Sequence, residues 1–213
     1  WRVKLYATAL IFACLLIPIG TQARTGLICI AILGIMVLRH TKRRMLYLLG
    51  VAIVGTATIP FLPSSFTNRM STIKKYDADE SASTRLAVWG WTWEYVKQNP
   101  LGGGFDVYLK NSVRYKIPTK PGEEEFESEQ REVTDSARAF HSSFFEMLGE
   151  QGFFGLFLWL FIHVGGVIRM EFLQRIYRKR NRPDETWVAP MAIALQQAGV
   201  IYLAGSLFVG IAF

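Results

Sequence analysis

Apolar residues occur in long blocks along the chain. Five blocks stand out, covering residues 3–19, 26–38, 45–62, 144–168 and 187–213. A helix needs about 20 residues to cross the roughly 30 Å of hydrocarbon in a bilayer. The pattern therefore predicts transmembrane helices, with the short second block using residues 22–25 as its outer turn.

The blocks divide the chain into three parts. Residues 1–62 are expected to form three transmembrane helices, residues 63–143 a long loop, and residues 144–213 two more helices. The first block does not read as a signal peptide, because another apolar segment follows it at once. The predicted fold class is all-α, a polytopic transmembrane helical bundle with one long, partly helical loop. Because the chain starts without Met and stops inside an apolar stretch, we expect it to belong to a longer membrane protein.

The formal net charge of +7 follows the predicted topology. Basic residues gather before the first block, at residues 39–44, and in the connection 169–186, which are alternate connections on one side of the membrane. By the positive-inside rule that side is the cytoplasm, so residues 63–143 face outward. This outer segment is balanced, with eleven Lys and Arg against twelve Asp and Glu. The charge therefore indicates topology, and no nucleic-acid partner is predicted.

The outer segment contains a predicted amphipathic helix. Ser83 is typical of an N-cap, and Asn99 with Pro100 ends a helix that covers residues 84–98. On it, Arg85, Trp89 and Trp93 follow one another at spacings of four, so they share a face. Trp89 is interpreted either as an anchor at the membrane surface or as a contact to a sugar ring or lipid headgroup.

The other parts of the outer segment carry weaker signals. The charged stretch 121–138 is interpreted as a mobile solvated loop, with a substrate lid as the alternative. The acidic motif "DADE" at 77–80 is a weak metal signal. We therefore predict neither a metal nor another cofactor.

Three residues at the outer ends of apolar blocks carry the candidate chemistry: Arg24, Arg85 and His141. Guanidinium groups bind diphosphate bidentately and stabilise the charge on a leaving group. A histidine can take a proton from a hydroxyl near neutral pH. The combination suits sugar transfer from a lipid diphosphate to a hydroxyl. The structural alternatives are snorkelling of Arg24 and a hydrogen-bonded helix-terminal role for His141.

Glu150 follows His141 in the pattern H-x8-E-x-G. Nine residues of helix span about 13 Å, which is too far for Glu150 to orient His141 directly. An acceptor contact and a structural pairing both stay open for Glu150. His163 lies deep in the fourth block, where packing or a helix–helix hydrogen bond is expected.

Three segments, "GTQARTG", "STRLAVWGWTWEYVKQNPLGGGF" and "AFHSSFFEMLGEQGFFGL", give the chain a resemblance to the O-antigen ligase and polymerase superfamily of bacterial membrane glycosyltransferases. The stretch "NRMSTIKKYDADES" further resembles the O-glycosylation ligases associated with exosortase systems. The likeness covers roughly residues 18–165, and the order of the three segments gives it specificity.

The resemblance implies a GT-C-like helical fold in the bacterial inner membrane and a glycan donor on undecaprenyl diphosphate, used on the periplasmic face without metal. The acceptor would be a hydroxyl on a glycolipid, a glycan or a protein. Arg24 and Arg85 match the arginines that bind the diphosphate, and His141 matches the histidine that activates the acceptor. Gln22 and Glu150 match motif positions with less defined roles.

Other functions stay open at this point. A polymerase of the same superfamily would share the fold and the donor but join repeat units to each other. A transporter or flippase is a less favoured class, because such proteins place polar groups at the midplane and carry internal repeats, which we do not find here. A structural membrane scaffold would tolerate replacement of Arg85 and His141.

Overall fold

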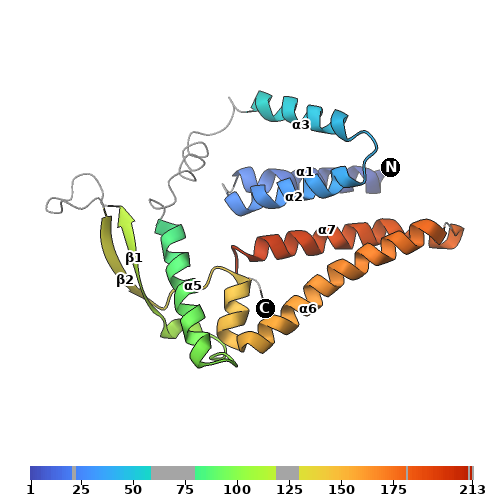
Figure 1. Cartoon of the computed structure of the whole chain (residues 1–213). Coiled ribbons are helices and arrows are strands. Elements are labelled where there is room, and N and C mark those ends of the chain that lie inside the picture. Colours follow the sequence, from blue (N-terminus) through green and yellow to red (C-terminus); the bar gives the residue numbers. More distant parts are fainter. Residues whose placement is uncertain (21–22, 59–79, 119–129, 181, 211, 213) are drawn as a thin grey trace. The chain divides into compact units, whose positions relative to one another are not determined.

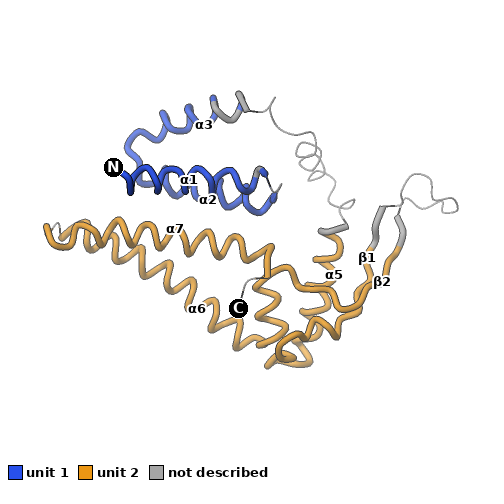
Figure 2. The backbone as a smooth tube through the Cα atoms, turned by 180° about the vertical axis from the view of Figure 1, so that it is seen from behind, with its two compact units in different colours: residues 1–73 blue, residues 74–213 orange. Residues whose placement is uncertain are grey.

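The computed structural model describes residues 1–20, 23–58, 80–118, 130–180, 182–210 and 212. The chain divides into two compact units, residues 1–73 and 74–213, which are coloured separately in Figure 2. Each unit is described by itself. The described residues are mostly helical, as the apolar blocks predict.

The first unit contains three helices: α1 (Arg2–Gly20), α2 (Arg24–Arg39) and α3 (Arg44–Thr58). They coincide with the first three apolar blocks. At the turn between α1 and α2, a Cβ on Gly26 would lie 2.6 Å from the Cβ of Pro18, so glycine permits the close approach. The backbone N–H of Ala23 also donates to the carbonyl oxygen of Pro18 at 3.0 Å. Whether these helices span a membrane stays a prediction.

The second unit begins with helix α5 (Glu80–Gln98) and ends with the long helix α6 (Ser143–Arg180) and helix α7 (Val188–Ser206). Figure 1 shows the first part of α6 beside α5 and its second part beside α7. The predicted outer helix is confirmed as helical, although it begins at Glu80 rather than at Thr84. Its end at Gln98 agrees with the stop signal of Asn99 and Pro100.

A β-hairpin corrects the all-α prediction. Strand β1 (Ser112–Pro118) pairs antiparallel with β2 (Gln130–Ser136), with Tyr115 opposite Val133. Part of the stretch 121–138 is therefore a strand, where a solvated loop was expected. The reason is long-range packing: Val113 and Tyr115 are buried in a core with Val88 of α5. The lid alternative falls partly on residues 121–129, which lie outside the described residues.

Helix α6 is broken at Gly152, whose backbone has φ 68° and ψ −164°. This region of backbone space is essentially restricted to glycine. A Cβ at this position would lie 2.1 Å from the carbonyl oxygen of Pro100 and 2.6 Å from the amide nitrogen of Gly102. The break therefore lets the glycine-rich loop after α5 pack directly against the α6 backbone.

The predicted basic connection 169–186 is largely helical, because α6 continues to Arg180 before the short 3-10 helix η5 (Pro183–Glu185). No Gly or Pro interrupts residues 167–182, and Arg175 pairs with Glu171 one turn earlier at 2.6 Å. The chain thus has no helix-breaking signal where the apolar block ends.

Within the described residues, two helical stretches are long and apolar enough to cross a membrane, namely Ser143–Arg180 and Pro183–Ser206. Their large apolar side chains are mostly exposed, including Phe154, Phe157, Phe161 and Ile162. His163 packs between the two helices, with its ring stacked on Tyr202 at 4.9 Å. The packing role predicted for this histidine is confirmed.

Candidate functional site

The predicted site residues fall in both units. Arg24 is the first residue of α2, in the first unit, and Gln22 lies outside the described residues. Arg85 and Trp89 lie on α5, and His141 comes two residues before α6 begins at Ser143. The second unit therefore brings Arg85, Trp89 and His141 together, while the part of Arg24 and Gln22 in this site stays a prediction.

His141 ends a strained connecting segment, residues 137–141, which together with Ser142 joins β2 to α6. His141 has φ 50° and Ala137 has φ 56°, both in the left-handed region. For a residue with a side chain this conformation costs about 1–2 kcal/mol. Such strain persists only where surrounding contacts enforce it, and it is common at functional sites.

One tryptophan on α5 supplies these contacts. The indole Nε1 of Trp89 donates to the carbonyl oxygen of Phe140 at 2.8 Å. Its ring stacks on Phe145 with 4.8 Å between ring centroids and an interplanar angle of 4°. The residues on both sides of His141 are thus held by a single side chain. A contact of Trp89 with substrate or membrane stays a prediction, since its ring and its N–H are already used within the protein.

Arg85 lies one helical turn before Trp89 on the same face of α5. Its Nε atom is buried and has no hydrogen-bond partner among the described residues. Leaving a buried charged donor without a partner is costly, by more than the roughly 1–3 kcal/mol of a neutral group. An anion bound at this point would remove that cost.

The surroundings of His141 favour its neutral form. Partial burial lowers the pKa of His141 below its ordinary value, and the nearby positive charges of Arg85 and Arg138 lower it further. A neutral imidazole is the form that accepts a proton, so the group is suited to act as a base near neutral pH. Arg85 therefore lies close enough to His141 for its charge to act on the imidazole, and a shared role in a functional site stays a prediction.

Arg138 is a neighbour of His141 that the sequence analysis did not single out. Its charge lies three residues before His141, yet the motif by itself does not separate it from the other arginines of the outer segment. The position of the Arg138 side chain depends on the hairpin, because Asp135 near the end of β2 forms an ion pair with it. The sequence signal that could have found it is its spacing from His141.

Glu150 has a structural contact on the far side of the first part of α6. Its Oε1 accepts the backbone N–H of Asp106 at 3.0 Å. Beside it, the N–H groups of Gly103 and Gly104 donate to the carbonyl oxygens of Gly149 and Glu150, at 2.9 and 3.0 Å. Glu150 therefore binds the glycine-rich loop to α6, and substrate contact by Glu150 stays a prediction.

No cluster of three or more His, Cys, Asp or Glu side chains that could hold a metal occurs in the part of the chain that the structure describes. Residues 77–79 of the acidic motif lie outside that part. The expectation that no metal is used stays a prediction.

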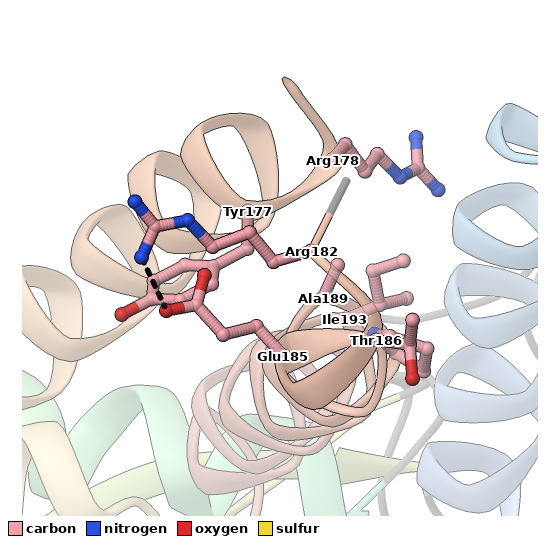
Figure 3. A pocket seen from close by; sticks show the side chains of 8 residues that line it. Tyr177, Arg178, Arg182, Glu185, Thr186, Ala189 and Ile193 are labelled. Atoms are coloured by element: carbon pink, nitrogen blue, oxygen red, sulfur yellow. Dashed lines mark ion pairs between the residues drawn. The ribbon is translucent and has the colours of Figure 1, made fainter. Parts of the chain in front are cut away.

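A cavity of about 320 Å³ lies at the opposite end of α6 from His141, where α6 meets α7. Figure 3 shows Arg182 beside Glu185 at this cavity, with their charged groups 4.0 Å apart. Tyr177 and Arg178 also line it. Because none of the predicted site residues lines this cavity, it is separate from the site at His141.

Comparison with known families gives one match. A family model described as O-antigen ligase matches residues 9–160, which is most of the chain. The chain belongs to the O-antigen ligase family. The match contains Arg24, Arg85, His141 and Glu150. No curated protein and no solved structure matches this O-antigen ligase family member.

Membership of the O-antigen ligase family has direct consequences for function. It implies an enzyme of the ligase or polymerase type that processes glycans, with glycan or lipid-linked substrates at a membrane. The two apolar helical stretches of the second unit fit a membrane protein. The family membership by itself assigns no role to any single residue.

Proposed function

We propose that this protein transfers a glycan from undecaprenyl diphosphate to an acceptor hydroxyl on the periplasmic face of the bacterial inner membrane. The proposal is carried by two neighbouring groups: a buried guanidinium nitrogen of Arg85 that has no hydrogen-bond partner among the described residues, and His141, whose pKa is lowered by burial and by nearby positive charge. The first group suits a diphosphate anion, and the second suits a hydroxyl proton.

The reaction is a direct displacement at C1 of the reducing-end sugar. The acceptor oxygen forms a bond to C1 while the bond from C1 to the diphosphate oxygen breaks, and the diphosphate leaves with the electron pair. His141 takes the proton of the acceptor hydroxyl. Arg85, together with Arg24 in this proposal, stabilises the charge that develops on the leaving oxygen. Attack opposite the leaving group inverts the configuration at C1.

The position of His141 supports this division of roles. It lies two residues before α6, and this helix is long and apolar enough to enter a membrane. A base at the end of such a helix can meet a water-soluble acceptor while the polyprenyl chain of the donor stays in the bilayer. Gln22 and Glu150 are kept as further candidates for substrate contact, as the motif positions suggest.

The proposal is tested with the full-length protein in proteoliposomes, supplied with a purified lipid-linked glycan and candidate acceptors. The variant His141→Ala is expected to lower transfer at least about 100-fold, which is the scale of general base catalysis. His40→Ala, which alters a histidine after α2, serves as the matched control. Transfer by His141→Ala at the wild-type rate would exclude the base role.

Mass analysis of the product separates ligase from polymerase. A single glycan on a foreign acceptor supports the proposed ligation. A ladder of repeat units without a foreign acceptor would instead assign the protein to the polymerase branch, with the same donor and the same roles for Arg85 and His141.

A further inference from the structure

Arg138 is fixed in place through its backbone. The buried side chain of Asn111 contacts it twice: Oδ1 accepts the N–H of Arg138 at 3.0 Å, and Nδ2 donates to its carbonyl oxygen at 2.6 Å. The N–H of Ala137 also donates to the carbonyl oxygen of Asn111 at 3.0 Å. Asn111 comes directly before β1, so the hairpin sets the position of Arg138.

The side chain of Arg138 is held as well. Its Nε donates to Asp135 at 2.9 Å, and its Nη2 contacts Asp135 and the hydroxyl of Tyr115. The carboxylate raises the pKa of Arg138, so the guanidinium stays charged. The side chain remains 46% exposed. Among the described residues, its Nη1 has no such contact and is available to a ligand.

These contacts hold Arg138 inside the strained connecting segment. Ala137 before it and His141 after it both have left-handed backbones. The segment is bound at one end by Asn111 and at the other by Trp89. Strain enforced from both ends indicates that the position of the residues between them matters for function.

Two guanidinium groups therefore approach His141 from different elements. Arg85 comes from α5 and Arg138 from the segment after β2, and both are close enough for their charges to act on the imidazole. Among the described residues, the buried Nε of Arg85 has no partner, and no hydrogen bond or ion pair involves Nη1 of Arg138. Two arginines next to one base form a site for an anion with several oxygens.

We propose that Arg138 is a substrate-binding residue that holds the diphosphate of the donor together with Arg85. This inference rests on the proposed function and adds a residue from the hairpin to it. The ion pair with Asp135 is compatible with this role. Asp135 binds Nε and Nη2 of Arg138 and fixes the orientation of the planar guanidinium, which leaves the N–H groups of Nη1 for the phosphate. A guanidinium held in this way loses little freedom when it binds a phosphate.

The test measures binding of farnesyl diphosphate, a short prenyl diphosphate, to the full-length protein in detergent micelles by isothermal titration calorimetry. Arg138→Gln is expected to weaken binding at least about tenfold, as loss of a charged hydrogen bond of 1.5–3 kcal/mol predicts. Arg114→Gln is the matched control, because Arg114 is exposed on the same hairpin and has the same charge. It is expected to stay within twofold of wild type.

Asp135→Asn separates binding from folding. It breaks the ion pair but keeps the charge of Arg138, so it is expected to retain most of the affinity. Equal affinity of Arg138→Gln and wild type would overturn the inference. A loss in Asp135→Asn as large as that in Arg138→Gln would overturn it too, since the effect would then come from the damaged segment.

The two proposals fail in different ways. If the wild-type protein does not bind farnesyl diphosphate, the proposed function fails. If Arg85→Gln abolishes binding while Arg138→Gln has no effect, only the role of Arg138 fails. If both variants lose affinity and Arg114→Gln does not, the inference is supported.

Discussion

Trp89 donates its indole N–H to the carbonyl oxygen of Phe140 at 2.8 Å across 51 positions of sequence. The residue before His141 is thus bound to the helix that carries Arg85 one turn away. Through this hydrogen bond, the distance between the proposed base and the proposed diphosphate ligand is set by helix packing rather than by a loop.

Removing that hydrogen bond should impair transfer. Trp89→Phe keeps an aromatic ring against Phe145 but leaves the Phe140 carbonyl without its donor, which costs about 1–3 kcal/mol. We expect lower thermal stability and a kcat reduced about tenfold or more, because His141 loses its fixed position. Trp93→Phe, at an exposed position of the same helix, is the control. An unchanged kcat in Trp89→Phe would contradict the positioning role.

The acidic limb of the pH profile should lie below the ordinary histidine value of about 6.5. His141 must be neutral to act as a base, and its pKa is lowered by burial and by the charges of Arg85 and Arg138. Removing a positive charge makes protonation easier, so Arg85→Gln should raise the pKa and shift the limb of kcat/KM to higher pH. Arg114→Gln should leave it in place. A limb that does not move in Arg85→Gln would argue against His141 as the titrating base.

Folding should be similarly sensitive to pH at His141. Because the folded state lowers the pKa of this group, the unfolded state binds the proton more tightly. Well above the unfolded pKa of about 6.5, His141 is neutral in both states and proton binding does not affect stability. As the pH falls below that value, the proton binds first to the unfolded state, and the native state loses stability. His141→Gln should flatten this part of the stability profile, measured by thermal unfolding between pH 5 and 8. An equally steep decline in the variant would assign the effect to other groups.

Gly152 should tolerate no side chain. Its backbone region is essentially restricted to glycine, at a cost of about 1–3 kcal/mol for other residues, and a Cβ would meet the Pro100 carbonyl at 2.1 Å. Gly152→Ala is expected to separate the glycine-rich loop from α6 and to lower the unfolding temperature. Gly165→Ala is the control, because nothing lies within 4 Å of its Cβ position. There alanine should be neutral or stabilise the helix by up to about 1 kcal/mol.

Glu150 offers a test between structural and substrate roles. Glu150→Gln keeps an oxygen that can accept the N–H of Asp106, whereas Glu150→Ala removes it. If the role is structural, Glu150→Gln should retain transfer, and Glu150→Ala should lose about 1–3 kcal/mol of stability. Loss of transfer in a stably folded Glu150→Gln would show that the negative charge is needed, as substrate contact requires.

Much of the fold could be predicted from the sequence, because local patterns determine it. Apolar blocks specified α1, α2, α3, α6 and α7, capping signals specified α5, and the i, i+4 spacing put Arg85 and Trp89 on one face of α5. The strand β2 could not be predicted, since Val133 is its single apolar residue within an otherwise polar stretch. Its pairing depends on the buried side chains of β1 and α5, which lie far away in sequence.

The sequence by itself determined the residue types of the site and their order: an arginine on an amphipathic helix and a histidine at the start of an apolar one. Only the tertiary structure decided that Arg85 and Arg138 both lie close enough to His141 for their charges to lower its pKa. It also decided that Glu150 binds a loop. The physical reason is that these relationships depend on packing and hydrogen bonds between residues 27 to 51 positions apart, which no periodicity along the chain encodes.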